Sequence, residues 1–213
     1  MNIKLDHVIP EPIRATLNQN SAIWNVQCEF ESGGFYLVDA QSGKGKSTFV
    51  QTVYGIRKDY SGKVYFDNTP ITDLDTFALA KFRQEKLSIL FQDLRLFLGL
   101  TAQENIEIKA SLAKSPWYDK IDEMAERLQI SHILNKQAEL LSYGERQRVA
   151  TLRALCQPFK WILLDEPFSH LDKENTLASF NLIQEVAKDQ GAGIIITTLG
   201  EDEFITFNHH LEL

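Results

Sequence analysis

The stretch Phe35–Tyr54, FYLVDAQSGKGKSTFVQTVY, decides the fold of this chain. Phe35–Val38 are apolar and typical of a buried strand, and a polar loop with Gly43 and Gly45 follows them. The residues from Lys46 onward are expected to be helical. A strand, a glycine-containing loop and a helix in this order predict an anion site, because the first N–H groups of a helix have no partner within it.

The loop matches the phosphate-binding P-loop pattern G-x-x-x-x-G-K-[ST], with Ala40 where the first glycine usually stands. The two glycines allow successive backbone N–H groups to point at phosphate oxygens. We expect Lys46 to reach the β- and γ-phosphates and the Ser47 hydroxyl to ligate Mg²⁺. A solvated basic loop is the alternative, but strand, glycines, Lys–Ser pair and helix together favour nucleotide binding. The predicted nucleotide-binding residues of this loop are Gln41, Ser42, Gly43, Lys44, Gly45, Lys46, Ser47 and Thr48.

A second apolar strand, Trp161–Leu164, leads directly into the carboxylates Asp165 and Glu166. The carboxyl ends of parallel strands border the ligand crevice, so both side chains are expected beside the phosphates. Asp165 is then a candidate for the Mg²⁺ shell, and Glu166 a candidate to polarise an attacking water. An acidic pair after a strand is more often an ordinary turn, and the upstream loop is what favours catalysis here.

Apolar, β-branched segments alternate with helical ones along the chain. The expected strands are Gly34–Asp39, Val64–Phe66, Leu87–Phe91, Lys160–Asp165 and Gly193–Thr198, and Lys173–Ala187 is an expected helix. This alternation predicts an α/β fold with a mostly parallel sheet covered on both faces. The first thirty residues, broken by Pro10 and Pro12, predict a small antiparallel layer at the sheet edge.

We expect a single nucleotide-binding domain over residues 1–213. Residues 1–91 and 158–213 form its core and β layer, and residues 92–157, rich in Ala, Leu, Glu, Lys and Arg, form an inserted helical subdomain.

Composition and charge exclude several other classes of protein. The 213 residues carry 22 Lys+Arg against 29 Asp+Glu, a net charge of −7, and 44% are hydrophobic, which is ample for a core. The acidity argues against a large phosphate-backbone footprint, so no nucleic-acid partner is expected. Cys28 and Cys156 are interpreted as reduced, buried thiols. With no secretory signal and no run of about 18 apolar residues, a cytoplasmic location is predicted.

The segment Leu141–Glu145 is predicted to open another helix, with Ser142 and Glu145 spaced as a capping box. Taken alone this is only a cap. Its order after the P-loop and before Asp165 and Glu166 resembles the signature motif, usually LSGGQ, of ATP-binding cassette (ABC) ATPases. In that family Gln92 would be the Q-loop glutamine, and Ser169–Asp172 would be the D-loop. The stretch 90–106 is similar to the bacterial subgroup for lipoprotein release, macrolide export and cell division.

The resemblance implies a P-loop ATPase that binds ATP and Mg²⁺ and forms a head-to-tail dimer, most simply a homodimer. It assigns Glu166, Gln92 and Lys46 to catalysis and Ser47, Gln92 and Asp165 to the metal. Ser142 and Gly144 would contact a γ-phosphate held by the second ATPase subunit. The helical subdomain would dock a transmembrane permease-type subunit at the cytoplasmic face of the inner (plasma) membrane.

Three departures from the family pattern accompany the resemblance. Thr198 stands where the family places a switch histidine, which predicts slow hydrolysis because threonine offers neither the charge nor the reach of imidazole. No aromatic residue lies between Met1 and Ile23, where the family stacks a tyrosine on adenine, so base specificity stays open. Tyr143 and Glu145 replace a glycine and the glutamine of the signature.

Two further functions stay open beside a transporter motor. One is a nucleotide-gated interaction module with little hydrolysis, which the missing histidine favours. The other is a soluble P-loop kinase or DNA-repair ATPase, although a repair ATPase needs long heptad repeats that are not present. The apolar residues Phe97, Leu98, Leu100 and Ile106 are candidates for docking, with core packing as the simpler interpretation.

Overall fold

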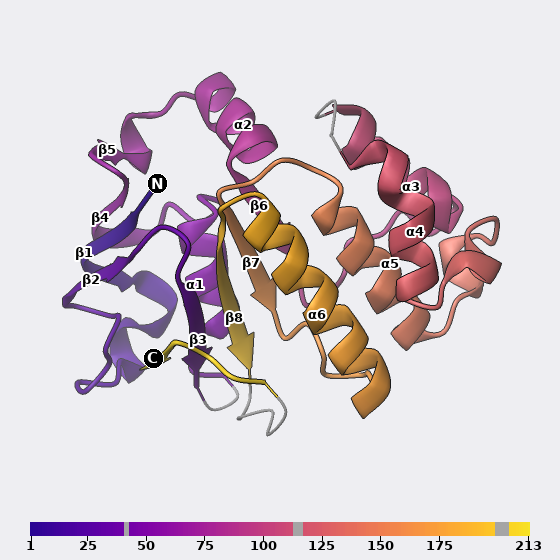
Figure 1. Cartoon of the computed structure of the whole chain (residues 1–213). Coiled ribbons are helices and arrows are strands. Elements are labelled where there is room, and N and C mark those ends of the chain that lie inside the picture. Colours follow the sequence, from indigo (N-terminus) through magenta and orange to yellow (C-terminus); the bar gives the residue numbers. More distant parts are fainter. Residues whose placement is uncertain (41–42, 113–116, 199–204) are drawn as a thin grey trace.

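The computed structural model describes residues 1–40, 43–112, 117–198 and 205–213, and it contains two sheets (Figure 1). The first is parallel, in the order β6-β7-β8-β3-β9, and the second is antiparallel, in the order β2-β1-β4-β5. The parallel strands are β3 (Phe35–Asp39), β6 (Leu87–Leu90), β7 (Trp161–Asp165), β8 (Gly193–Thr198) and β9 (His209–Glu212). The antiparallel strands are β1 (Ile3–Pro10), β2 (Gln27–Phe30), β4 (Tyr60–Phe66) and β5 (Thr69–Pro70).

The described part of the chain contains six α-helices. They are α1 (Lys46–Val53), α2 (Thr76–Glu85), α3 (Ala102–Leu112), α4 (Ile121–Arg127), α5 (Tyr143–Leu155) and α6 (Lys173–Asp189). Short 3₁₀ helices cover Glu11–Thr16, Ile71–Asp73, Tyr118–Lys120, Ser131–Ile133 and Ala138–Leu140.

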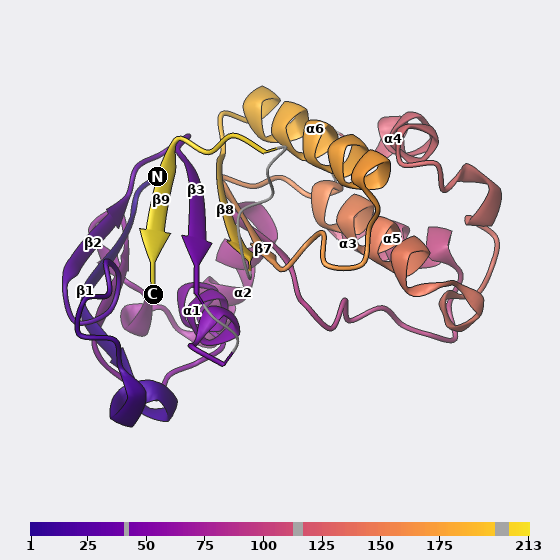
Figure 2. The same cartoon turned by 90° about the horizontal axis from the view of Figure 1, so that it is seen from below.

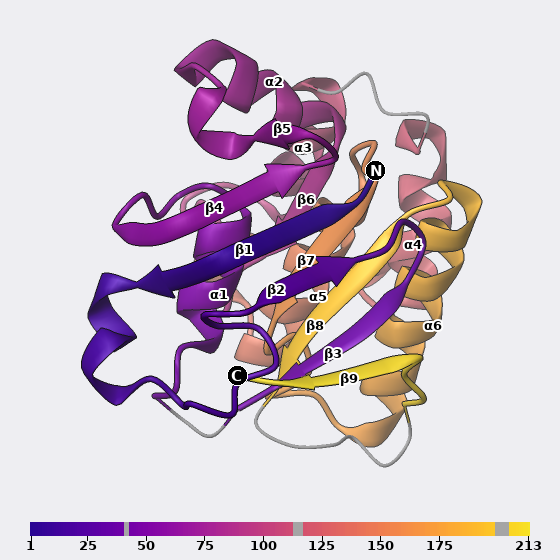
Figure 3. The same ribbon diagram turned by 90° about the vertical axis from the view of Figure 1, so that its left-hand side faces the viewer.

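The parallel sheet is buried on both faces, because alternate residues of each strand enter different cores. Leu37 on β3 and Leu164 on β7 belong to the core shared with α5 and α6. Their neighbours Val38 and Leu163 belong to the core shared with α1 and the antiparallel sheet. Figure 2 shows α5 and α6 on one side of the parallel sheet and the β1–β2 layer on the other. Helix α1 is thereby fixed between two sheets, as Figure 3 also shows.

A single close approach explains why β8 begins with glycine. A Cβ atom added to Gly193 would lie 2.4 Å from Cζ3 of Trp161, the fully buried first residue of β7. The two strands are paired at this point, Trp161 opposite Gly193, so no larger residue fits without moving the sheet.

The α/β class and the separate N-terminal antiparallel layer agree with the sequence-based expectation. Two details of that expectation were wrong. The segment Val64–Phe66 was expected among the strands of the mostly parallel sheet, but it ends β4, which pairs antiparallel with β1. Helix α6 ends at Asp189, two residues beyond the predicted Ala187, because its last turn extends past the final apolar residue into two exposed polar residues.

Strand β9 was not predicted, and its composition explains why. Its sequence, HHLE, is mostly exposed and carries no apolar run, yet it pairs in parallel with β3 at the sheet edge. The two cysteines agree with prediction, since Cys28 and Cys156 are buried and free. Burial raises the pKa of both thiols to about 12, which keeps them protonated.

None of the helices in the described ranges has the length and apolar character needed to cross a membrane.

Candidate nucleotide site

The P-loop ends at an open helix start. Gly43 and Gly45 have φ values of 76° and 102°, a region that glycine enters without steric cost. Gly45 is the N-cap of α1 and has no side chain with which to bond the first amides of that helix. Those amides and the helix dipole favour an anion at this position. Gln41 and Ser42, two of the predicted binding residues, lie outside the described residues.

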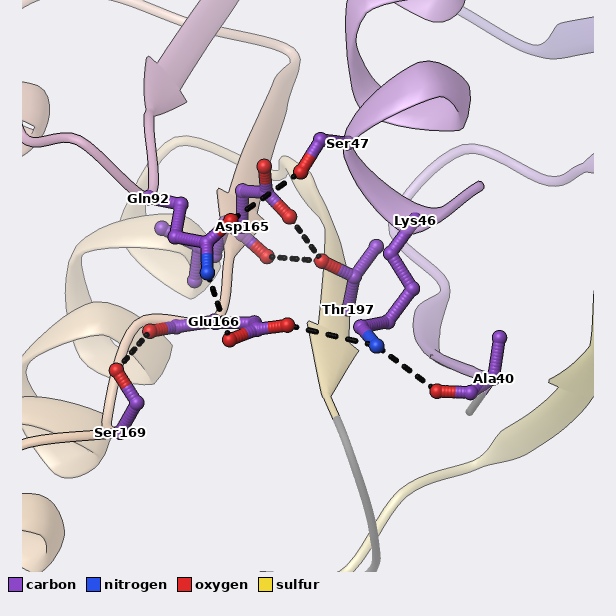
Figure 4. A network of polar contacts seen from close by, with 9 residues as sticks. Ala40, Lys46, Ser47, Gln92, Asp165, Glu166, Ser169 and Thr197 are labelled. Carbon is purple, nitrogen blue, oxygen red and sulfur yellow. Dashed lines mark hydrogen bonds and ion pairs between the residues drawn. The ribbon is translucent and has the colours of Figure 1, made fainter. Parts of the chain in front are cut away.

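Lys46, the first residue of α1, is 5% exposed and points into the site. Its Nζ donates a hydrogen bond to the Ala40 carbonyl at 2.8 Å and forms an ion pair with Glu166 Oε1 at 3.4 Å (Figure 4). A buried ammonium needs such partners, because burial without them is costly. Phosphate oxygens that enter the cradle offer the same cation stronger, charge-assisted bonds.

Glu166 follows β7 with a left-handed backbone, φ 50°, which costs a non-glycine residue of the order of 1–2 kcal/mol. Its amide donates to the Thr197 carbonyl at 3.0 Å, and its own carbonyl accepts from Gln147 Nε2 at 3.3 Å. Both bonds hold the strained turn, and the turn aims the carboxylate at Lys46 and at Gln92 Nε2, 3.1 Å away. The carboxylate is therefore positioned by its backbone and by two side chains.

The predicted metal ligands come from three elements that meet at one edge of the parallel sheet. Ser47 Oγ on α1 and Gln92 Oε1 after β6 are 3.4 Å apart, and Asp165 ends β7 (Figure 4). Asp165 is 4% exposed, and its Oδ1 accepts a hydrogen bond from Thr197 Oγ1 at 2.7 Å. Hydroxyl, amide and carboxylate oxygens are the donors that Mg²⁺ prefers, so these residues fit that ion.

In the described part of the chain, no group of three or more His, Cys, Asp or Glu residues could hold a metal ion on its own. A Mg²⁺ ion in this site would therefore depend on nucleotide phosphates for part of its coordination, as is usual for this metal.

The signature segment has a different environment from the P-loop. Ser142 Oγ accepts from the Glu145 amide at 3.3 Å, and Glu145 Oε2 accepts from the Ser142 amide at 2.7 Å, which completes the capping box of α5. Bonds to the Ser142 side chain and amide lower the pKa of Glu145 below its ordinary value. At Gly144 an added Cβ would lie 3.3 Å from the His170 carbonyl. The structure thus brings Gly144 against the D-loop segment, not against Lys46.

Lys46, Ser47, Gln92 and Glu166 are thus joined by direct contacts, and Asp165 is bonded to Thr197. Ser142 and Gly144 instead belong to the α5 N-terminus. Thr198, at the switch position, is the last residue of β8. It follows Thr197, whose hydroxyl donates to Asp165. Ser169 Oγ donates to the Glu166 carbonyl at 3.3 Å (Figure 4) and is 2.9 Å from Nδ1 of His170. The catalytic and metal-binding roles of all these residues stay predictions.

The sequence reasoning missed the supporting contacts of three residues. These residues are Thr197, which holds Asp165, Gln147, which bonds the Glu166 and Pro167 carbonyls, and Tyr143, whose hydroxyl donates to the Gln92 carbonyl at 2.9 Å. A signal for Gln147 was available, because it is a polar residue on the apolar face of α5. The structure leaves its side chain only 1% exposed. A polar side chain in that position requires buried partners.

The four candidate docking residues separate into two groups. Ile106 is fully buried on α3, as the core interpretation expected, and Leu100 is partly buried. Phe97 and Leu98 are 56% and 49% exposed, so core packing is wrong for these two.

Residues 23–169, more than half of the chain, match the family described as ABC transporter. The chain belongs to the ABC transporter family. It is therefore an ABC ATPase subunit of the transporter class.

Two curated relatives show the level of similarity within the family. The chain is 33% identical over 176 residues to the lipoprotein-releasing system ATP-binding protein LolD of Buchnera aphidicola subsp. Schizaphis graminum, covering 81% of this chain and 77% of LolD. It is 32% identical over 180 residues to the glucose import ATP-binding protein GlcV of Saccharolobus solfataricus, covering 83% of this chain. The match spans about half of GlcV, 51% of its length. The similarity to LolD agrees with the lipoprotein-release subgroup that the sequence resembles.

Solved ABC cassettes share the fold of this chain. The dimeric structure of MJ0796, a bacterial ABC transporter cassette, superposes with a TM-score of 0.80 at 29% identity, covering 93% of this chain and 88% of MJ0796. A post-hydrolysis MJ0796 dimer bound to ADP and Pi gives a TM-score of 0.78 with the same identity and coverage. The cbiO1 structure from Clostridium perfringens gives 0.70 at 29% identity, covering 93% and 78% of the two chains. These neighbours support ATP hydrolysis by this ABC ATPase.

Proposed function

We propose that two copies of this ABC ATPase close on ATP and Mg²⁺ and drive a transmembrane permease-type partner at the cytoplasmic face of the membrane. The observation that carries the proposal is the contact network of Lys46, Gln92 and Glu166 beside an uncapped α1 N-terminus. Lys46 is the candidate cation for phosphate, and Glu166, which contacts both Lys46 and the Gln92 amide, is the candidate base for water. The dimeric MJ0796 cassette and cbiO1, described as part of the transporter complex cbiONQ, support the two-copy and membrane-partner elements.

In the proposed reaction the residues of this chain supply position and charge. The P-loop amides and Lys46 hold the β- and γ-phosphates, and Glu166 accepts a proton from the attacking water. Ser47, Gln92 and Asp165 would hold Mg²⁺, which neutralises developing phosphate charge. Gln92, bonded to Glu166 at 3.1 Å, orients the carboxylate toward the water.

Across the proposed dimer, the α5 N-terminus of one copy faces the nucleotide of the other. Ser142 is exposed at that end of the helix, and Gly144 leaves its backbone accessible to a phosphate. Hydrolysis removes the bridging γ-phosphate and releases the two copies from each other, which converts nucleotide state into movement. Exposed Phe97 and Leu98, next to the Q-loop, are the apolar residues that we assign to contact with the membrane partner.

The experiment compares Glu166→Gln with the parent chain and with Glu123→Gln, a control at an exposed position on α4. We expect ATP to bind Glu166→Gln normally, phosphate release to fall by about 10²–10⁴-fold, and a nucleotide-bound dimer to accumulate in light scattering. The control should match the parent in all three measurements. Turnover at the parent rate in Glu166→Gln would show that the general base is wrongly assigned. Loss of turnover without any dimer would contradict the two-copy arrangement.

A second candidate function is a nucleotide-gated interaction module with little hydrolysis. The observation that favours it is that a threonine, Thr198, occupies the switch position. Thr198 directly follows Thr197, which bonds Asp165. Phosphate release measured for the chain with and without its membrane partner separates the two functions. The family match favours either of them over a soluble kinase or repair ATPase.

A further inference from the structure

Three loops of the ATPase meet at the side chain of Tyr143. Its hydroxyl donates to the backbone carbonyl of Gln92 at 2.9 Å, and its ring centroid lies 4.1 Å from that of His170 in the D-loop. Tyr143 itself is the first residue of α5, directly after Ser142. One partly buried side chain therefore contacts the Q-loop and the D-loop from the signature segment.

A bond to the Gln92 carbonyl affects the active site, because the Gln92 side chain contacts both Glu166 and Ser47. Its Nε2 donates to Glu166 and its Oε1 accepts from Ser47 at 3.4 Å. A shift of the Gln92 backbone would move both contacts.

Helix α5 holds the same loop at a second place. Arg153, near the helix C-terminus, donates to the carbonyls of Leu94 and Arg95 at 2.5 Å and 2.7 Å. Leu94 and Arg95 both have left-handed backbones, with φ values of 59° and 48°, so the loop needs these restraints to keep its shape. Burial lowers the pKa of Arg153 to about 10, so it stays charged at neutral pH.

These contacts make α5 and the Q-loop a single mechanical unit. The helix is thirteen residues long, its capping box is complete and its inner face is buried, so a displacement at Ser142 is passed along its whole length. Arg153 fixes the far side of the loop, and Tyr143 connects the first turn of the helix to Gln92. A phosphate contact at the α5 N-terminus therefore has a direct path to Glu166 in the same chain.

We propose that Tyr143 is a positioning residue for ATP hydrolysis, whose hydroxyl couples nucleotide contact at Ser142 and Gly144 to the Gln92 amide that orients Glu166. The coupling rests on the proposed two-copy arrangement, because the nucleotide at Ser142 and Gly144 belongs to the other copy. Each copy then reaches the geometry for hydrolysis only when its own α5 contacts the nucleotide held by the other copy. The two sites of the dimer are thereby made to respond to each other.

The test variant is Tyr143→Phe, which removes the hydroxyl and keeps the ring against His170. Tyr65→Phe on β4, in the antiparallel sheet, is the matched control. We expect kcat for phosphate release to fall by up to about tenfold, the effect of one neutral hydrogen bond. The Kd for ATP and the KM should stay at the parent values, the melting temperature should fall by no more than a few degrees, and the Hill coefficient for ATP should move toward one. The control should reproduce the parent kinetics.

Hydrogen exchange separates coupling from simple packing. In a Glu166→Gln background, ATP should protect the amides of residues 92–95 when Tyr143 is present, and protect them less in the Tyr143→Phe double variant. Parent-like kcat in Tyr143→Phe, or a lower melting temperature with an unchanged Hill coefficient, overturns the proposal alone. Failure of Glu166→Gln to dimerise with ATP overturns the two-copy arrangement first, and the coupling with it.

Discussion

Helices α1 and α5 both begin at segments expected to contact phosphate, yet their N-termini are built in opposite ways. The start of α1 has a glycine N-cap and no side-chain cap among the described residues, with buried Lys46 beside it. The start of α5 is closed by Ser142 and Glu145, each bonded to the other's amide. One helix start is open to an external anion, and the other already satisfies its own donors.

This difference assigns the two helices different tasks. An open N-terminus with a lysine is suited to hold triphosphate by itself, because unpaired amides, dipole and cation all act on the same anion. A capped N-terminus carries a carboxylate of its own, which makes independent capture of phosphate unfavourable. It can add contacts only to a nucleotide that another P-loop already holds.

The largest expected effect comes from removing the Lys46 ammonium at the open N-terminus of α1. Lys46→Ala should weaken ATP binding by about tenfold to a hundredfold, because a charge-assisted bond to phosphate is lost. Lys58→Ala, at an exposed position after α1, serves as the charge-matched control and should bind ATP like the parent. Nucleotide titration by calorimetry measures both. Equal affinity of Lys46→Ala and the parent would refute the open-end assignment.

A smaller effect should follow from removing the side-chain cap at the N-terminus of α5. Ser142→Ala removes the side-chain cap of α5 and should cost about 1 kcal/mol of unfolding free energy, a few degrees in melting temperature. Ser142→Asn retains a capping oxygen and is the control. ATP binding by the isolated chain should be unchanged in both variants. If Ser142→Ala weakened ATP binding as much as Lys46→Ala, the two helix ends would not have separate tasks.

The smallest effect concerns the charge of Glu145. Its folded-state pKa lies below the ordinary value of 4.5, so its contribution to stability is complete above about pH 4.5 and is lost as the pH falls through the lowered pKa. Glu145→Gln keeps the capping geometry and has no such titration. The parent should therefore be more stable than the variant at pH 7, and the gap should close in urea unfolding near pH 3. A gap independent of pH would exclude the carboxylate as its source.

The P-loop could be predicted closely because local sequence dictates its geometry. Gly43 and Gly45 adopt the positive φ values that their lack of a side chain permits, and α1 begins at Lys46. The capping box at Ser142 is equally local, since both partners lie within one helical turn. Motifs of this kind are visible in one stretch of chain.

The contacts that hold the catalytic groups were not visible in this way. Thr197 and Asp165 are 32 positions apart, and the Tyr143 hydroxyl and Gln92 carbonyl are 51 apart. Strand β9 is a further example, since its exposed residues gave no pattern and only its pairing with β3 makes it a strand. Such features depend on which segments the two cores bring side by side.

By itself, the sequence determined the fold class, the phosphate loop, the order of the motifs and the family, because glycine placement, strand–helix alternation and caps act over a few residues. Only the tertiary structure decided that Glu166 is held between Lys46 and Gln92 and that α5 is tied to the Q-loop. Hydrogen bonds between distant segments form only after burial has fixed the backbones, and no local residue pattern records that placement.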